Sequence, residues 1–166
     1  VDRGARYAIG RIVLFAASPA PFTPDADMTG LRQALAAGKI TRFAIANPEH
    51  APYGRAAEQA LKRAGLWEAI VPRLVLGENV SQAAQFAASG STQGGIFALS
   101  LAKTPLITAA GTHVVLPDEA HQPLTQRMAL LKRAGAPARL FYDYLQQPGA
   151  RAVFQRYGFA VPDNRS

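Results

Sequence analysis

The sequence predicts an α/β fold in which a mostly parallel sheet is flanked by helices. Short apolar runs rich in β-branched residues stop at turn-forming residues, as buried strands do. Segments with apolar residues at helical spacing follow these runs, and the strand-then-helix order repeats along the chain. The 166 residues suffice for one ordinary domain or for two small lobes that share a cleft.

Each predicted element follows from these patterns. The predicted strands are 12–17, 42–46, 74–76 and 96–99, with further extended segments at 112–116 and 127–131. The predicted helices are 28–37, 53–63, 80–87, 138–146 and 149–157. Asp27 and Asn79 are residue types that cap a helix N-terminus, and Pro148 suits the first turn of the last helix. Residues 89–95 are predicted to form a loop.

Composition narrows the function classes. Hydrophobic residues make up 49% of the chain and charged residues 17%, which favours a buried core over disorder. No apolar run approaches the roughly 20 residues that cross a bilayer, so no stable membrane insertion is predicted. Cysteine is absent, which excludes disulfides, thiolate catalysis and cysteine-ligated metals. The net charge is +7, but the basic residues are scattered, so a solvated basic surface is favoured over nucleic-acid binding.

Catalytic motifs are missing as well. The sequence holds no nucleophile elbow, no P-loop and no H-E-x-x-H helix. His50, His113 and His121 lack the spacing of metal ligands. Glu49 and His50 beside Tyr53 fit a polar loop better than an acid–base pair. The sequence therefore predicts neither an enzyme nor a metal site.

Two strand-to-helix junctions, 46–54 and 76–80, carry the informative geometry. In an open parallel sheet both helix N-termini lie at the carboxyl edge of the strands, where ligands bind. The first N–H groups of a helix have no intrahelical acceptors, and the helix dipole places partial positive charge there. Two such helix starts that converge would form an anion site of neutral donors.

The same junctions carry a resemblance to a known family. The resemblance is carried by five segments, which match the family's motifs in their order along the chain and in their spacing: 47–57, 64–67, 77–80, 141–145 and 154–159. The chain resembles, over about residues 7–159, the periplasmic molybdate-binding proteins of ABC importers, which are type II periplasmic binding proteins. Five motifs in one order are more specific than any single motif.

The resemblance implies fold and function. Members of this family have two α/β lobes that close on an oxyanion, and they deliver molybdate or tungstate to a membrane permease without enzymatic activity. They hold the anion by backbone N–H groups and hydroxyls and need no cofactor. A periplasmic location is implied, although no signal peptide is present in this chain. The ligand-sensing domain of a transcriptional regulator with the same fold is the alternative.

The family motif also implies site residues. Tyr53 and Val80 would bind the oxyanion through their backbone amides, as ligands of an anion and not of a coordinated metal cation. Pro52 and Gly54 would shape the first junction, and Asn79 would cap the second helix. We expect the parent protein to prefer molybdate and tungstate to sulfate, because fixed donors cannot collapse onto a smaller ion.

The sequence departs from the family in two places. Where some members place a ligand-binding tyrosine, this chain has Ala98, and the Tyr53 side chain or Ser100 would have to compensate. About half of the family's first lobe, with two hydroxyl-bearing ligands, has no counterpart here. The implied division is a crossing segment at 1–13, a complete second lobe at 14–109, and a crossing strand with first-lobe helices at 110–166.

The incomplete first lobe has a physical consequence for the tail. Its helices carry apolar side chains that should pack on strands outside this chain, so they would be exposed. We therefore expect self-association, domain swapping or a rearranged tail. The apolar side chains in question are Phe141, Tyr144, Leu145, Val153 and Phe154.

Overall fold

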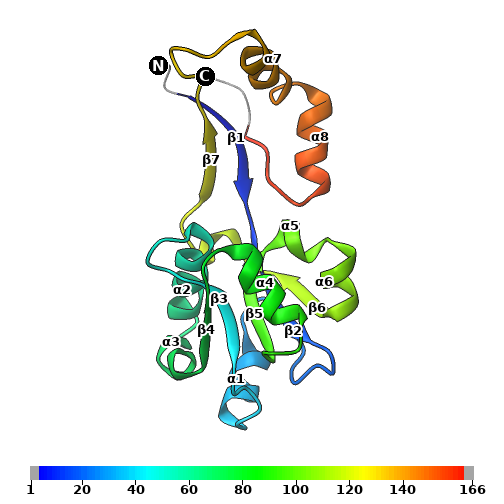
Figure 1. Cartoon of the computed structure of the whole chain (residues 1–166). Coiled ribbons are helices and arrows are strands. Elements are labelled where there is room, and N and C mark those ends of the chain that lie inside the picture. The colour runs from blue at the N-terminus through cyan, green and yellow to red at the C-terminus, as the bar shows by residue number, and fades with distance from the viewer. Residues whose placement is uncertain (1–3, 163–166) are drawn as a thin grey trace. The chain divides into compact units, whose positions relative to one another are not determined.

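The computed structural model describes residues 4–162 and divides the chain into two compact units (Figure 1). Unit 1 consists of segments 1–10 and 123–166, and unit 2 consists of residues 11–122. Unit 2 therefore contains both predicted strand-to-helix junctions. Whether the two units are the two lobes of the family, with the division expected above, stays a prediction.

Unit 2 is built on a five-stranded sheet in the order β4-β3-β5-β2-β6. Strand β3 pairs in parallel with β4 and β5, whereas β2 pairs antiparallel with β5 and β6. The sheet is therefore mixed: four strands run in one direction and β2 runs against them. The strands are β2 Ile12–Ala17, β3 Phe43–Ala46, β4 Leu74–Gly77, β5 Gly94–Ala98 and β6 Gly111–Val115.

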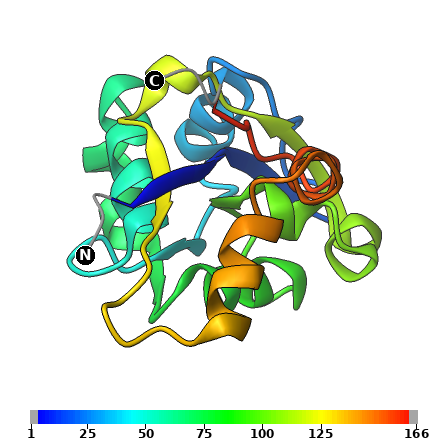
Figure 2. The ribbon, with the colours of Figure 1, turned by 90° about the horizontal axis from the view of Figure 1, so that it is seen from above.

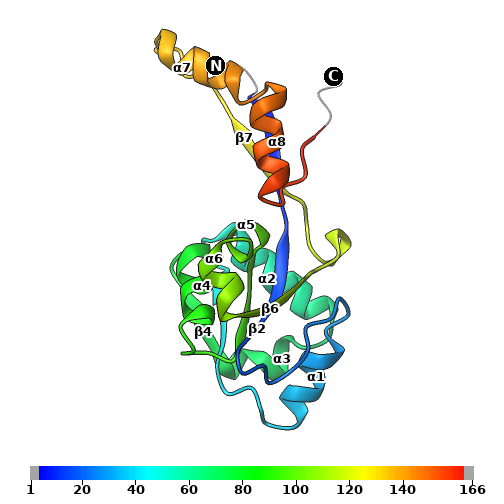
Figure 3. The same cartoon turned by 90° about the vertical axis from the view of Figure 1, so that its right-hand side faces the viewer.

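Helices cover both faces of this sheet, as an α/β fold requires. Helices α4 to α6 lie on one face and α1 to α3 on the other (Figures 1 and 3). The helices are α1 Thr29–Ala36, α2 Pro52–Arg63, α3 Trp67–Ile70, α4 Val80–Ala88, α5 Leu99–Ala102 and α6 Pro105–Ala110. Two short 3₁₀ turns, η1 Val71–Arg73 and η2 Asp118–Ala120, complete the unit.

The core of unit 2 is centred on β2, in which every residue is buried. Alternate side chains of a strand point to opposite faces, so Val13 and Phe15 face α4 to α6. There the Phe15 ring packs on the Phe97 ring at 5.4 Å between centroids. Burial on both faces explains why β2 appears in the sequence as a continuous apolar run instead of an alternating one.

The structure corrects two details of the sequence prediction. Strand β5 begins at Gly94 and not at Ile96, because Gly94 and Gly95 pair with both β2 and β3. Both glycines lie against backbone carbonyls of these strands, with no room for a side chain. The first helix is capped mainly by Asp25 and not by Asp27. The Asp25 carboxylate accepts hydrogen bonds of 2.7 Å from the N–H groups of Thr29 and Gly30.

Unit 1 contains a two-stranded antiparallel sheet and two helices (Figures 1 and 2). Its elements are β1 Ala5–Gly10, β7 Leu124–Met128, α7 Ala136–Tyr144 and α8 Pro148–Arg156. An isolated bridge pairs Ile9 with Ala160. The predicted extended segment at 127–131 is displaced to β7, and β1 was not predicted.

The tail helices are only partly covered. The expectation was wrong for Phe154, because its ring packs on Tyr7 of β1 at 5.4 Å and on Phe159 at 6.2 Å. Phe141 and Tyr144 are 61% and 54% exposed, in line with an apolar face that the described residues of unit 1 leave uncovered. Self-association through this face stays a prediction.

Among residues 4–162, no helix has the length and apolar character that a membrane span requires.

His113 on β6 gives unit 2 a pH-dependent contribution to stability. Burial, and secondarily the positive charge of Lys103, lower the pKa of His113 below its ordinary value of 6.5. Below pH 6.5 the unfolded chain binds a proton at this imidazole more readily than the folded chain. The contribution is therefore present above that pH and is lost as the pH falls through the folded pKa.

We expect the urea concentration at the midpoint of unfolding to decrease as the pH is lowered from about 7.5 to about 5.5. The decrease should be smaller in His113→Gln. His50→Gln is the matched control, because its imidazole is more exposed. Equal pH dependence in the wild-type protein and His113→Gln would contradict the assignment.

Candidate functional site

The two predicted junctions lie side by side at one edge of the unit 2 sheet. Strands β3 and β4 are parallel neighbours, and their last residues, Ala46 and Gly77, are paired. The Asn47 N–H donates to the Gly77 carbonyl oxygen at 2.8 Å, which extends the pairing one step beyond the strands. Helices α2 and α4 therefore both begin beyond the same strand ends.

The first junction is folded by local hydrogen bonds and by close packing. The Asn47 side chain accepts from the Glu49 N–H at 3.0 Å, and the Asn47 carbonyl accepts from the Ala51 N–H at 2.9 Å. Pro52 is the first residue of α2, where its missing N–H costs no helical hydrogen bond. A Cβ at Gly54 would lie 2.2 Å from the Ala46 carbonyl oxygen. Only glycine therefore allows α2 to start this close to β3.

The second junction is a capped helix start. Asn79 is extended, and its side chain accepts from the Gln82 N–H at 3.0 Å, so the predicted N-cap is present. The Gln82 side chain in turn accepts from the Glu78 N–H at 2.7 Å. The bond to Asn79 occupies the third N–H of α4, that of Gln82. The first two helical positions, Val80 and Ser81, follow the cap directly.

Two kinds of contact join the junctions. Buried Ala46, Ala51 and Ala83 form a small apolar cluster against which Val80 packs. At the loops, the His50 imidazole Nε2 lies 3.0 Å from the Glu78 carbonyl oxygen and 3.6 Å from the Glu78 carboxylate. The starts of α2 and α4 are thus connected both at their base and across their loops.

The structure places both predicted residues, Tyr53 and Val80, at helix starts. Tyr53 is the second residue of α2 and Val80 the first of α4, so both lie in first helical turns, where the partial positive charge of the helix dipole is concentrated. Ala98 and Ser100 lie at the start of α5, on a different strand end. Within residues 4–162, His, Asp and Glu form no group of three that could hold a metal ion.

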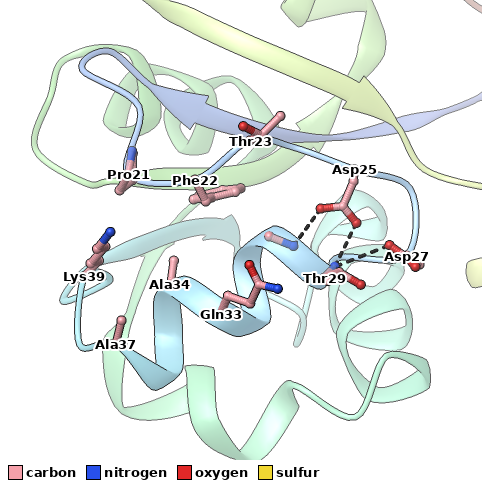
Figure 4. Close-up of a pocket in the computed structure, with 11 residues that line it drawn as sticks. Pro21, Phe22, Thr23, Asp25, Asp27, Thr29, Gln33, Ala34, Ala37 and Lys39 are labelled. Atoms are coloured by element: carbon pink, nitrogen blue, oxygen red, sulfur yellow. Dashed lines mark hydrogen bonds between the residues drawn. The ribbon is translucent and has the colours of Figure 1, made fainter.

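A cavity of about 670 Å³ lies beside α1 in the same unit (Figure 4). Asp25, Asp27 and Lys39 are its charged lining residues. The Asp25 carboxylate is directed at the first turn of α1 and caps it, as Figure 4 shows. The acidic side chains of this cavity thus have a structural role in starting the helix.

Sequence reasoning found the two helix starts but missed the link between their loops. The pattern Glu49-His50 suggested only a polar loop, because the partner of His50 is 28 residues away in the sequence. No local signal marks such a pair.

The mixed α/β sheet with two neighbouring helix starts matches the fold of a solved periplasmic binding protein, so the chain has a periplasmic-binding-protein-like fold. Residues 1–160 match the family model described as bacterial extracellular solute-binding protein. The chain belongs to this family.

Individual relatives are molybdate-binding proteins. The chain is 34% identical to the molybdate-binding protein ModA of Rhodobacter capsulatus and 33% identical to that of Azotobacter vinelandii, each over 93% of this chain. It spans 58% and 60% of the lengths of these two relatives. The solved periplasmic molybdate-binding protein of Azotobacter vinelandii matches with a TM-score of 0.84 and 29% identity, over 98% of this chain and 70% of that one.

Proposed function

We propose that this chain is the oxyanion-recognition part of the substrate-binding protein of an ABC importer, with molybdate and tungstate as ligands. The observation that carries the proposal is the joined pair of helix starts, α2 and α4, beyond the ends of two adjacent parallel strands. The backbone amides of Tyr53 and Val80 are the proposed donors, and Pro52, Gly54 and Asn79 hold them in position.

Helix starts suit a dianion of this kind. Partial charges on first-turn N–H groups attract an anion, and a set of fixed amides selects it by size. A site of N–H donors also favours a fully deprotonated oxyanion over a protonated one, because an O–H group of the anion would find no acceptor among N–H groups. The names of the Rhodobacter and Azotobacter relatives support molybdate as the ligand.

The rest of the proposed role follows from the family. The protein would act in the periplasm, would catalyse no reaction, and would deliver its ligand to a membrane permease. Further residues of the full-length protein would supply the remaining contacts to the anion. Because the chain spans about three fifths of its relatives, the proposal concerns the full-length protein.

Replacing Val80 with proline tests the proposed donor directly. Proline at the first helical position removes the N–H without costing a helical hydrogen bond, and the extended Asn79 before it has a conformation that proline accepts. We expect the full-length Val80→Pro protein to keep its fold and to lose about 10- to 100-fold in molybdate affinity, the effect of one hydrogen bond to a charged ligand. Isothermal titration with molybdate measures this.

Val80→Ala is the matched control, because it removes the side chain that packs on Ala46, Ala51 and Ala83 but keeps the amide. It should bind molybdate within about threefold of the wild-type protein. Wild-type affinity in a folded Val80→Pro protein would show that this amide is not a ligand.

A further inference from the structure

We propose that His50 is a positioning residue that sets the spacing between the two amide-bearing helix starts, and thereby the discrimination between larger and smaller oxyanions. This inference rests on the proposed function, because it concerns the same site. Its structural basis is the contact between His50 in the β3–α2 loop and Glu78 in the β4–α4 loop.

The direction of the hydrogen bond is fixed by chemistry. A backbone carbonyl oxygen only accepts, so the His50 Nε2 must carry the proton that it donates to Glu78 at 3.0 Å. The Glu78 carboxylate, at 3.6 Å, adds attraction only when the imidazole is charged, and its side chain is 80% exposed. The carbonyl contact is therefore the part of the link that holds in either protonation state.

The position of the link makes it relevant to spacing. His50 lies three residues before Tyr53, and Glu78 lies two residues before Val80. The other cross-junction contacts lie closer to the sheet: the Asn47 N–H to the Gly77 carbonyl, and the buried alanine cluster. The His50–Glu78 contact thus joins the two loops outside the strand ends, just before the residues whose amides are the proposed donors.

Spacing between fixed donors decides which anion fits. Two donor sets held apart form short hydrogen bonds with a large tetrahedral anion, but they leave longer and weaker bonds with a smaller one. If the link is removed, the loops can adjust to either anion. Affinity for the larger anion then falls more than affinity for the smaller one, so the ratio of the two affinities falls.

Three substitutions at His50 in the full-length protein test this. His50→Ala and His50→Leu both remove the donor, and leucine keeps most of the side-chain volume. His50→Gln keeps an N–H near the place of Nε2. His113→Gln, on β6, is the matched histidine control. Affinities for molybdate and for sulfate are measured by isothermal titration, with displacement titration for the weaker ligand.

We expect His50→Ala and His50→Leu to lower the molybdate-to-sulfate affinity ratio about tenfold, the effect of one hydrogen bond. His50→Gln should restore the ratio to within about threefold of the wild-type value, and His113→Gln should not change it. A wild-type ratio in both His50→Ala and His50→Leu would overturn the inference, as would equal losses in His50→Gln and His50→Leu. A wild-type protein that binds neither molybdate nor tungstate would instead overturn the proposed function.

Discussion

Replacing Gly54 with alanine should destabilise unit 2 by about 3 kcal/mol, the upper part of the range for overpacking. The added Cβ would lie 2.2 Å from the Ala46 carbonyl oxygen, 2.7 Å from its carbonyl carbon and 2.9 Å from the Asn47 carbonyl carbon. All three atoms belong to the backbone, so no side chain can rotate away. Helix α2 would have to move off the end of β3, and the first helix start would move with it.

Urea denaturation measures the loss of stability. Gly149→Ala is the matched control: Gly149 lies in the first turn of α8, with nothing within 4 Å of an added Cβ. That substitution should be neutral or stabilise by up to about 1 kcal/mol, because alanine has the higher helix propensity. Equal midpoints for Gly54→Ala and the wild-type protein would mean that the contact between α2 and β3 is not as close as described.

Replacing Phe97 with alanine should cost about 3–5 kcal/mol, the usual effect of deleting a fully buried phenylalanine ring. Phe97 has no exposed surface, and its ring packs against Phe15 and the residues of α4 that face the sheet. The surrounding strands and helices can fill the resulting cavity only in part. The loss includes the preference of the two rings for a tilted arrangement, which is 51° here.

Phe141→Ala in α7 is the control for this substitution, because Phe141 is 61% exposed. It should change the free energy of unfolding by about 0.5 kcal/mol or less. A small effect of Phe97→Ala, similar to that of Phe141→Ala, would contradict the placement of Phe97 at the centre of the core.

The sequence predicted the elements whose pattern is local. Segment 12–17 is a continuous apolar run and forms β2 with the same bounds. Helix α2 was predicted to begin at Tyr53 and begins one residue earlier, at Pro52. Asn79 caps α4 as its residue type suggested. In each case the signal lies within one helical turn or one strand.

The elements that escaped prediction depend on distant partners or are too short for a pattern. Strand β1 pairs with β7, more than 110 residues away, and has no continuous apolar run of its own. Helix α5 has four residues and α6 has six, too few to show helical periodicity. Gly94 and Gly95 looked like a loop because glycine is common in loops, but here they allow backbones to approach within a sheet.

The candidate site was predictable as a topology and not as a set of contacts. Parallel neighbouring strands bring their following helices together, so the neighbouring starts of α2 and α4 followed from the fold class. The contact of His50 with Glu78 did not follow, because it depends on how two loops fold against each other. The antiparallel direction of β2 was missed for a related reason: the sequence of a strand does not specify which strands it pairs with or in which direction.

The loop between β3 and α2 and the loop between β4 and α4 begin at one shared strand register, Ala46 opposite Gly77. If recognition depends on main-chain groups beyond that register, mutation has unequal effects on it. Exchanging the side chain at position 53 or 80 for any other than that of proline leaves a main-chain donor in place, whereas inserting or deleting one residue in either loop displaces it. Over evolutionary time such a protein would tolerate drift in residue identity at the very positions that contact its ligand, and would resist insertions and deletions beside them.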